Sequence, residues 1–100
     1  MGAQDFQIYA TETTPQKAFK KAVKESLYSY GHGGYTGSIA EKSTYTMASS
    51  ITLSESKAQQ LINATLDTTY ADKWGPAGCI QISTSNKQLN TYIFYGWASC

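Results

Sequence analysis

Residues 91–98 read Thr-Tyr-Ile-Phe-Tyr-Gly-Trp-Ala, a run of aromatic and β-branched residues that is typical of a strand. Residues 79–83, Cys-Ile-Gln-Ile-Ser, alternate in polarity and predict a second strand. Between the two strands, Ser-Asn-Lys at 85–87 favours a turn. We therefore expect the two strands to form a hairpin.

Two helices are predicted upstream of this hairpin. Thr14 can cap the first, with Pro15 in its first turn and an apolar stripe running on to Tyr30. Ser54 can cap the second, whose apolar positions continue to Leu66. Shorter strands are expected at 6–10, from Ile39 to Ala40, and at 45–48.

This order of elements predicts an α+β fold, a single compact domain that spans residues 1–100. We expect a mainly antiparallel sheet with the two helices packed on one of its faces. With 41% hydrophobic and 13% aromatic residues, the chain has enough apolar surface for one core and does not resemble a disordered protein.

The last strand is aromatic on both sides. Side chains alternate across a strand, so Tyr92 and Phe94 should face one side of the sheet, and Tyr95 and Trp97 the other. If both helices lie on one face, the second face needs a partner surface or a stacking ligand. This predicts a homo-oligomer, most simply a two-fold dimer. The alternative is that helices cover both faces.

The charge of the chain limits its partners. The formal net charge is +1 and there is no arginine, so no bidentate contact to a phosphate or a guanine edge is available. This argues against a nucleic-acid polymer as partner.

The location of the protein is predicted from its hydropathy pattern. The chain has no apolar run of about 18 residues and no basic-then-apolar start, so we expect no membrane association and a cytoplasmic location. Cys79 and Cys100 are expected to stay reduced because there is no secretory signal, and a single disulfide between them is the alternative.

The segment 31–38, Gly-His-Gly-Gly-Tyr-Thr-Gly-Ser, has four glycines in eight positions. Its amides could cradle a polar or anionic ligand, although it matches no phosphate-binding motif and follows a helix rather than opening one. The alternative is a helix C-cap followed by a connection. A second glycine-rich loop, 73–78, carries Lys73 and Trp74.

We expect the two loops to converge on one pocket, with Tyr95 or Trp97 at its wall. The ligand should be anionic and flat, since lysines supply point charges and aromatic rings supply a stacking face. The residues predicted to line this site are His32, Gly33, Gly34, Tyr35, Thr36, Gly37, Lys42, Lys73, Trp74, Tyr95 and Trp97. The lysines of the first helix, which could also attract anions, are interpreted as a solvated face.

Catalysis is not expected. His32, the only histidine, lies in the glycine loop without a recognisable partner, and a nucleophile needs an adjacent, oriented base. His32, Cys79 and Cys100 match no zinc-binding spacing. We therefore predict no catalytic residue, no metal and no cofactor.

Three segments, Tyr30–Lys42, Asp72–Ile80 and Phe94–Ser99, resemble a group of small, mostly uncharacterised proteins of tailed bacteriophages. The resemblance implies an accessory protein that acts in the host cytoplasm, and such proteins often counter bacterial defence. The first hypothesis is a sponge that sequesters a nucleotide-derived immune signal without turnover. The alternatives are a protein–protein inhibitor of a host factor and a small hydrolase that uses His32 with Glu41.

Overall fold

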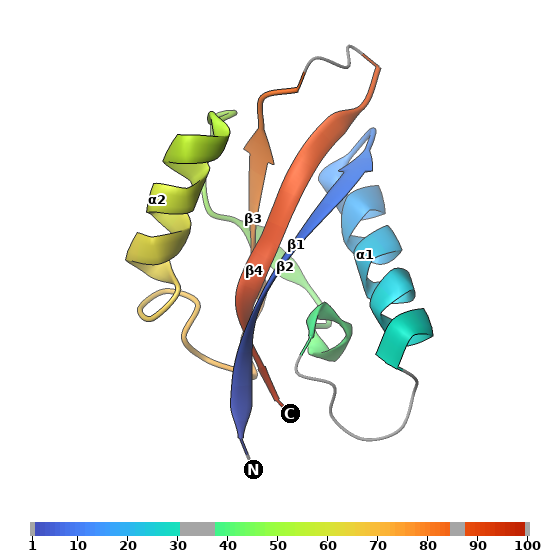
Figure 1. Cartoon of the computed structure of the whole chain (residues 1–100), viewed down its shortest axis with the longest axis vertical. Coiled ribbons are helices and arrows are strands. Elements are labelled where there is room, and N and C mark those ends of the chain that lie inside the picture. Colours follow the sequence, from blue (N-terminus) through green and yellow to red (C-terminus); the bar gives the residue numbers. More distant parts are fainter. Residues whose placement is uncertain (1, 31–37, 85–87, 100) are drawn as a thin grey trace.

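The computed structural model describes residues 2–30, 38–84 and 88–99 of the chain. Its elements form one four-stranded sheet with two helices packed on it, which confirms the α+β fold class (Figure 1). In chain order the elements are β1 (Ala3–Glu12), α1 (Pro15–Tyr30), the 3-10 turn η1 (Ile39–Glu41), β2 (Tyr45–Met47), α2 (Glu55–Thr65), β3 (Ala77–Ile82) and β4 (Asn90–Ser99).

The sheet has the strand order β1-β4-β3-β2. β4 runs antiparallel to both of its neighbours, with Ile93 opposite Tyr9 on one side and Ile80 on the other. The predicted pairing of the last two strands is therefore confirmed. β2 is parallel to β3, so the sheet is mixed rather than purely antiparallel.

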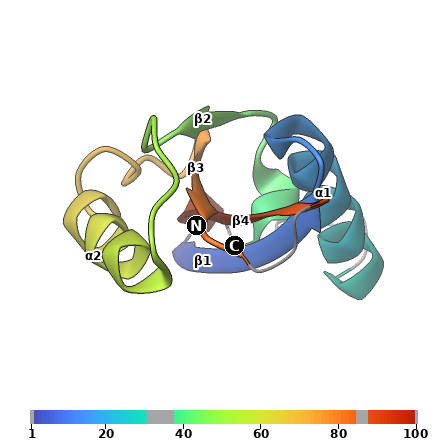
Figure 2. The ribbon, with the colours of Figure 1, turned by 90° about the horizontal axis from the view of Figure 1, so that it is seen from above.

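The two helices lie on opposite faces of the sheet, which Figure 2 shows from above. The expectation that both helices pack on one face was wrong, and so was its consequence that one aromatic face of β4 stays uncovered. Phe94 packs under α1 with Phe19, and Tyr95 packs in the separate cluster that holds Ile62 of α2. The aromatic residues of β4 are thus core on both sides.

The connections between strands explain this arrangement. β1, β2 and β3 all run in one direction, so α1 and α2 are both crossover helices between parallel strands. The first crossover passes from one edge strand, β1, to the other, β2, and the second returns from β2 to β3. Crossovers of the same hand that travel in opposite directions across a sheet place their helices on opposite faces.

The starts of both helices follow the predicted caps. The Thr14 hydroxyl accepts from the Lys17 amide at 3.2 Å, and the Ser54 hydroxyl accepts from the Lys57 amide at 3.3 Å. The predicted strand from Ile39 to Ala40 was wrong. Residues 39–41 form a single 3-10 turn instead, because the Ser38 hydroxyl caps the amide of Ala40 and Ile39 turns inward to the core under α1. The predicted turn at 85–87 lies outside the described residues.

Candidate functional site

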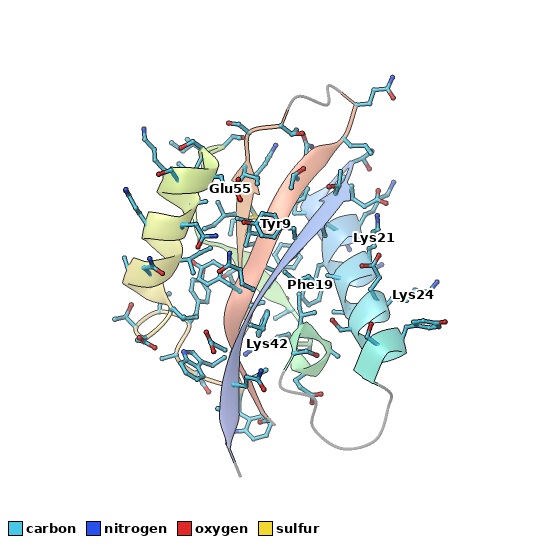
Figure 3. All side chains as sticks on the ribbon, viewed as in Figure 1. Tyr9, Phe19, Lys21, Lys24, Lys42 and Glu55 are labelled. Carbon is cyan, nitrogen blue, oxygen red and sulfur yellow. The ribbon has the colours of Figure 1, made fainter. Side chains whose placement is uncertain are left out.

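A groove of about 530 Å³ lies between α1 and the segment that follows η1. Apolar side chains dominate its lining, and lysines contribute to its rim. The lining residues are Phe19, Lys20, Val23, Lys24, Leu27, Tyr28, Lys42 and Ser43. Figure 3 labels Phe19, Lys24 and Lys42 on the elements that bound this groove.

The spacing of residues along α1 builds this groove. Ala18, Ala22 and Ser26 recur every fourth residue and are buried, so the helix packs closely on the sheet through small side chains. One position further along the helix, Phe19, Val23 and Leu27 form a second row that reaches the groove. A third row at the same spacing, Lys20, Lys24 and Tyr28, therefore stands at its rim.

The two lysines of the rim are exposed, and Glu25 lines a neighbouring hollow together with Lys24 and Tyr28. Lys20 and Lys24 form no hydrogen bond or ion pair with any residue in 2–30, 38–84 or 88–99. Tyr28 beside them is 93% exposed, although its ring is large and apolar. A smaller hollow shares Phe19, Lys20 and Ser43 and extends the groove toward the start of α1. The rim thus offers two cations and one aromatic ring to solvent.

Lys42, one of the predicted ligand-binding residues, is buried and holds the second loop in place. Its ammonium donates to the carbonyl oxygens of Asp72, Lys73 and Gly75 at 3.3, 3.1 and 2.8 Å. Three donors meet three acceptors, so the hydrogen-bonding capacity of the ammonium is fully used. Burial lowers the pKa of Lys42 below its ordinary 10.5, and the Asp72 carboxylate acts in the opposite direction. Lys42 also lines the groove.

The turn that Lys42 holds presents Trp74 to solvent. The Trp74 amide donates to the Asp72 carboxylate at 2.9 Å, and the Gly75 amide donates to the Asp72 carbonyl at 3.0 Å. Trp74 is 63% exposed, and the Lys73 ammonium lies 5.3 Å from the centre of a Trp74 ring. Lys73 also reaches the carbonyl of Gly2 at 3.5 Å. Lys73 and Trp74 therefore lie together, as their sequence positions require.

Tyr95 is fully buried on the α2 side of the sheet. Its hydroxyl lies 2.8 Å from the Thr65 hydroxyl, and its ring meets the Tyr70 ring edge-on at 5.0 Å. Desolvation raises the pKa of Tyr95 to about 12. In this structure Tyr95 is a core residue. Trp97, two positions further along β4, is half-buried and pairs with Asp5 of β1.

The remaining predicted site residues, His32, Gly33, Gly34, Tyr35, Thr36 and Gly37, lie outside the described residues, and so does the predicted convergence of the two loops. The groove is not predicted from the sequence, where Lys20 and Lys24 are interpreted as part of a solvated helix face. The missed signal is Tyr28, an aromatic residue at the same four-residue spacing as these two lysines, on the polar side of the helix.

Comparisons with models of known protein families, with curated proteins and with solved structures find no significant match to this chain. Across residues 2–30, 38–84 and 88–99, no three histidine, cysteine or acidic side chains are grouped so as to hold a metal ion. In the same residues, neither helix has the length and hydrophobicity needed to cross a membrane.

Proposed function

We propose that this protein binds an anionic small molecule that carries a flat ring, without turning it over, and that the groove along α1 is the site. The observation that carries the proposal is the combination of an apolar floor with the rim of Lys20, Lys24 and Tyr28. Pockets for small ligands typically join an apolar lining to a few polar groups that fix orientation.

Each part of the groove matches one part of such a ligand. A flat ring can lie on Phe19 and Val23 while Tyr28 supplies a stacking face. Phosphate or carboxylate groups can reach Lys20 and Lys24, which lie one helical turn apart. Because lysines act as point charges at an exposed rim, binding should weaken as salt is added.

A nucleotide-derived signal has this chemistry, because it joins a flat base to phosphates. The resemblance of three segments to bacteriophage proteins supports the same ligand class, since a sponge for nucleotide immune signals needs binding alone. The proposed function is therefore sequestration of such a signal in the host cytoplasm. The lysines of α1 take the place of Lys42 in this proposal, because the Lys42 ammonium is already engaged by three carbonyl groups.

A thermal-shift screen with cyclic dinucleotides, cyclic ADP-ribose isomers and NAD tests the proposal. A ligand at 100 times its Kd should stabilise the fold by about 2.7 kcal/mol. The double variant Lys20→Gln/Lys24→Gln should lose the shift, and Tyr28→Ala should weaken binding about tenfold or more, since base stacking is worth roughly 1–3 kcal/mol.

Lys57→Gln is the matched control, because Lys57 is an exposed lysine on α2, on the opposite face of the sheet. An equal loss in this control would contradict the site, and consumption of a bound nucleotide would contradict binding without turnover. If no member of the panel binds, the nucleotide proposal fails.

A second candidate is a protein–protein inhibitor. The adjoining hollow along Gln16, Thr44 and Tyr45 makes the groove long enough to favour an extended acidic segment of a partner protein. Capture of such a partner by the wild-type chain, lost in Lys20→Gln/Lys24→Gln, would favour this candidate over the small-molecule ligand.

A further inference from the structure

The outer edge of β1 is the longest unpaired strand edge in the described chain. β1 has ten residues and pairs with β4 along its whole length, from Ala3 opposite Ser99 to Glu12 opposite Asn90. No strand within residues 2–30, 38–84 or 88–99 lies on its other side. Backbone groups that point away from β4 therefore have no sheet partner among the described residues, although the Lys21 ammonium donates to the Thr11 carbonyl at 3.4 Å.

Among the described residues, neither helix runs along this edge. β1 lies in front of the sheet in Figure 1, and in Figure 2 α1 and α2 flank the two faces without crossing its outer side. The opposite edge is different. β2 has only three residues, and the chain beyond it continues to pair with β3: the Ala48 amide donates to the Cys79 carbonyl at 2.8 Å, and the Leu53 amide donates to the Gln81 carbonyl at 3.0 Å.

β1 also has few of the features that normally protect an edge strand, since its only charged residues are Asp5 and Glu12. Natural edges are short, bulged, or interrupted by proline or lysine, because an open edge is a template for pairing with another chain. The segment Ala3–Glu12 contains no proline, lysine or glycine, and its register with β4 runs without a bulge. An edge with these properties favours β-strand addition by a partner.

We propose that the partner is a second copy of this chain, and that two β1 strands pair antiparallel about a two-fold axis at Gln7. Such an axis stands perpendicular to the sheet, so it brings together side chains that lie on the same face. Asp5 and Glu12 are seven residues apart and lie on opposite faces of β1, so this symmetry never sets one acid opposite the other.

The register centred on Gln7 pairs compatible side chains. Phe6 faces Ile8 of the second copy, and this aromatic–β-branched pair occurs twice because of the symmetry. Asp5 faces the ring of Tyr9 in the second copy, where the Tyr9 hydroxyl donates to Glu55 of the same copy at 2.7 Å, and Gln7 faces its own counterpart. The two sheets join into one of eight strands, in which the open edges of both copies are paired.

Sedimentation equilibrium and chemical cross-linking test this interface. The wild-type chain should have twice its 10.9 kDa mass at micromolar concentration. Gln7→Lys sets two ammonium groups opposite each other and should give a folded monomer, whereas Gln60→Lys, the same change at an exposed position of α2, should stay dimeric. A wild-type monomer, or equal dissociation in both variants, would overturn the proposal.

Cysteines introduced one at a time into a Cys100→Ser background, in which the remaining Cys79 is buried, test the register. A short bis-maleimide should join two Gln7→Cys chains. It should not join two Gln4→Cys chains, because the two Gln4 positions lie roughly 20 Å apart along the paired strands. Cross-linking at Gln4 without cross-linking at Gln7 would overturn the register. None of these measurements involves the groove on α1, so they test the dimer separately from ligand binding.

Discussion

At the scale of single residues, Gly78 shows what a glycine of the second loop does. A Cβ atom placed there would lie 2.6 Å from Cε1 of Tyr95 and 3.0 Å from Cε2 of Tyr70. The absence of a side chain lets both rings pack against the backbone of β3. The sequence had suggested that glycines in this loop admit a ligand, but here the neighbour is the protein's own aromatic core.

Gly78→Ala should therefore destabilise the fold by about 1–3 kcal/mol, the usual cost of overpacking a core. Gly75→Ala is the matched control in the same loop, because its Cβ would meet only Asp72 at an ordinary 3.4 Å. Urea denaturation followed by circular dichroism measures both variants. Equal stability of the two variants would contradict the packing role assigned to Gly78.

At the scale of elements, Lys42 joins the segments that lead into the parallel strands β2 and β3. Lys42→Met should keep most of the packing of its stem but leave three carbonyl groups without their donor. We expect a loss of about 2 kcal/mol in the free energy of unfolding, because a hydrogen bond to a charged group contributes roughly 1.5–3 kcal/mol.

Urea denaturation with Lys57→Met as the exposed-lysine control checks this expectation. Acrylamide quenching of tryptophan fluorescence should also increase in Lys42→Met, since Trp74 would lose its fixed turn. Unchanged stability and quenching would show that the three hydrogen bonds do not hold the loop.

Elements with a local cause were predictable from the sequence. Thr14 and Ser54 mark the helix starts because their hydroxyls bond amides three residues away. The 3-10 turn at Ile39 was missed because its cause, insertion of this side chain under α1, is a tertiary contact. The hydrogen bond from the Lys42 ammonium to the Asp72 carbonyl, 30 residues along the chain, has no local signal in the sequence either.

At the scale of the whole molecule, the sequence predicted that both faces of β4 need cover but not what covers them. Alternation set Phe94 and Tyr95 on opposite faces, and this was confirmed. A helix, a ligand and a second copy of the chain would leave the same alternation in the sequence. The choice depends on the direction of the two crossovers, which only the parallel pairing of β2 with β3 reveals.

The sheet lies between α1 and α2, and an ionisable group is buried on each of its faces. This arrangement predicts that the free energy of unfolding falls at alkaline pH. Burial raises the pKa of Cys79 from 9.0 to about 12, and that of Tyr95 from 10.0 to about 12. The folded state therefore keeps protons that the unfolded chain loses, so this contribution to stability is complete below pH 9 and is lost progressively between pH 9 and pH 12. At about 1.4 kcal/mol per pKa unit, Cys79 contributes on the order of 4 kcal/mol and Tyr95 on the order of 3 kcal/mol. Urea midpoints should fall steeply from pH 8 to pH 11 in the wild-type protein and in the Tyr28→Phe control, whose tyrosine is exposed. Cys79→Ala/Tyr95→Phe should be less stable at pH 8 but lose less over the same range, and a slope equal to that of the wild type would contradict the assignment.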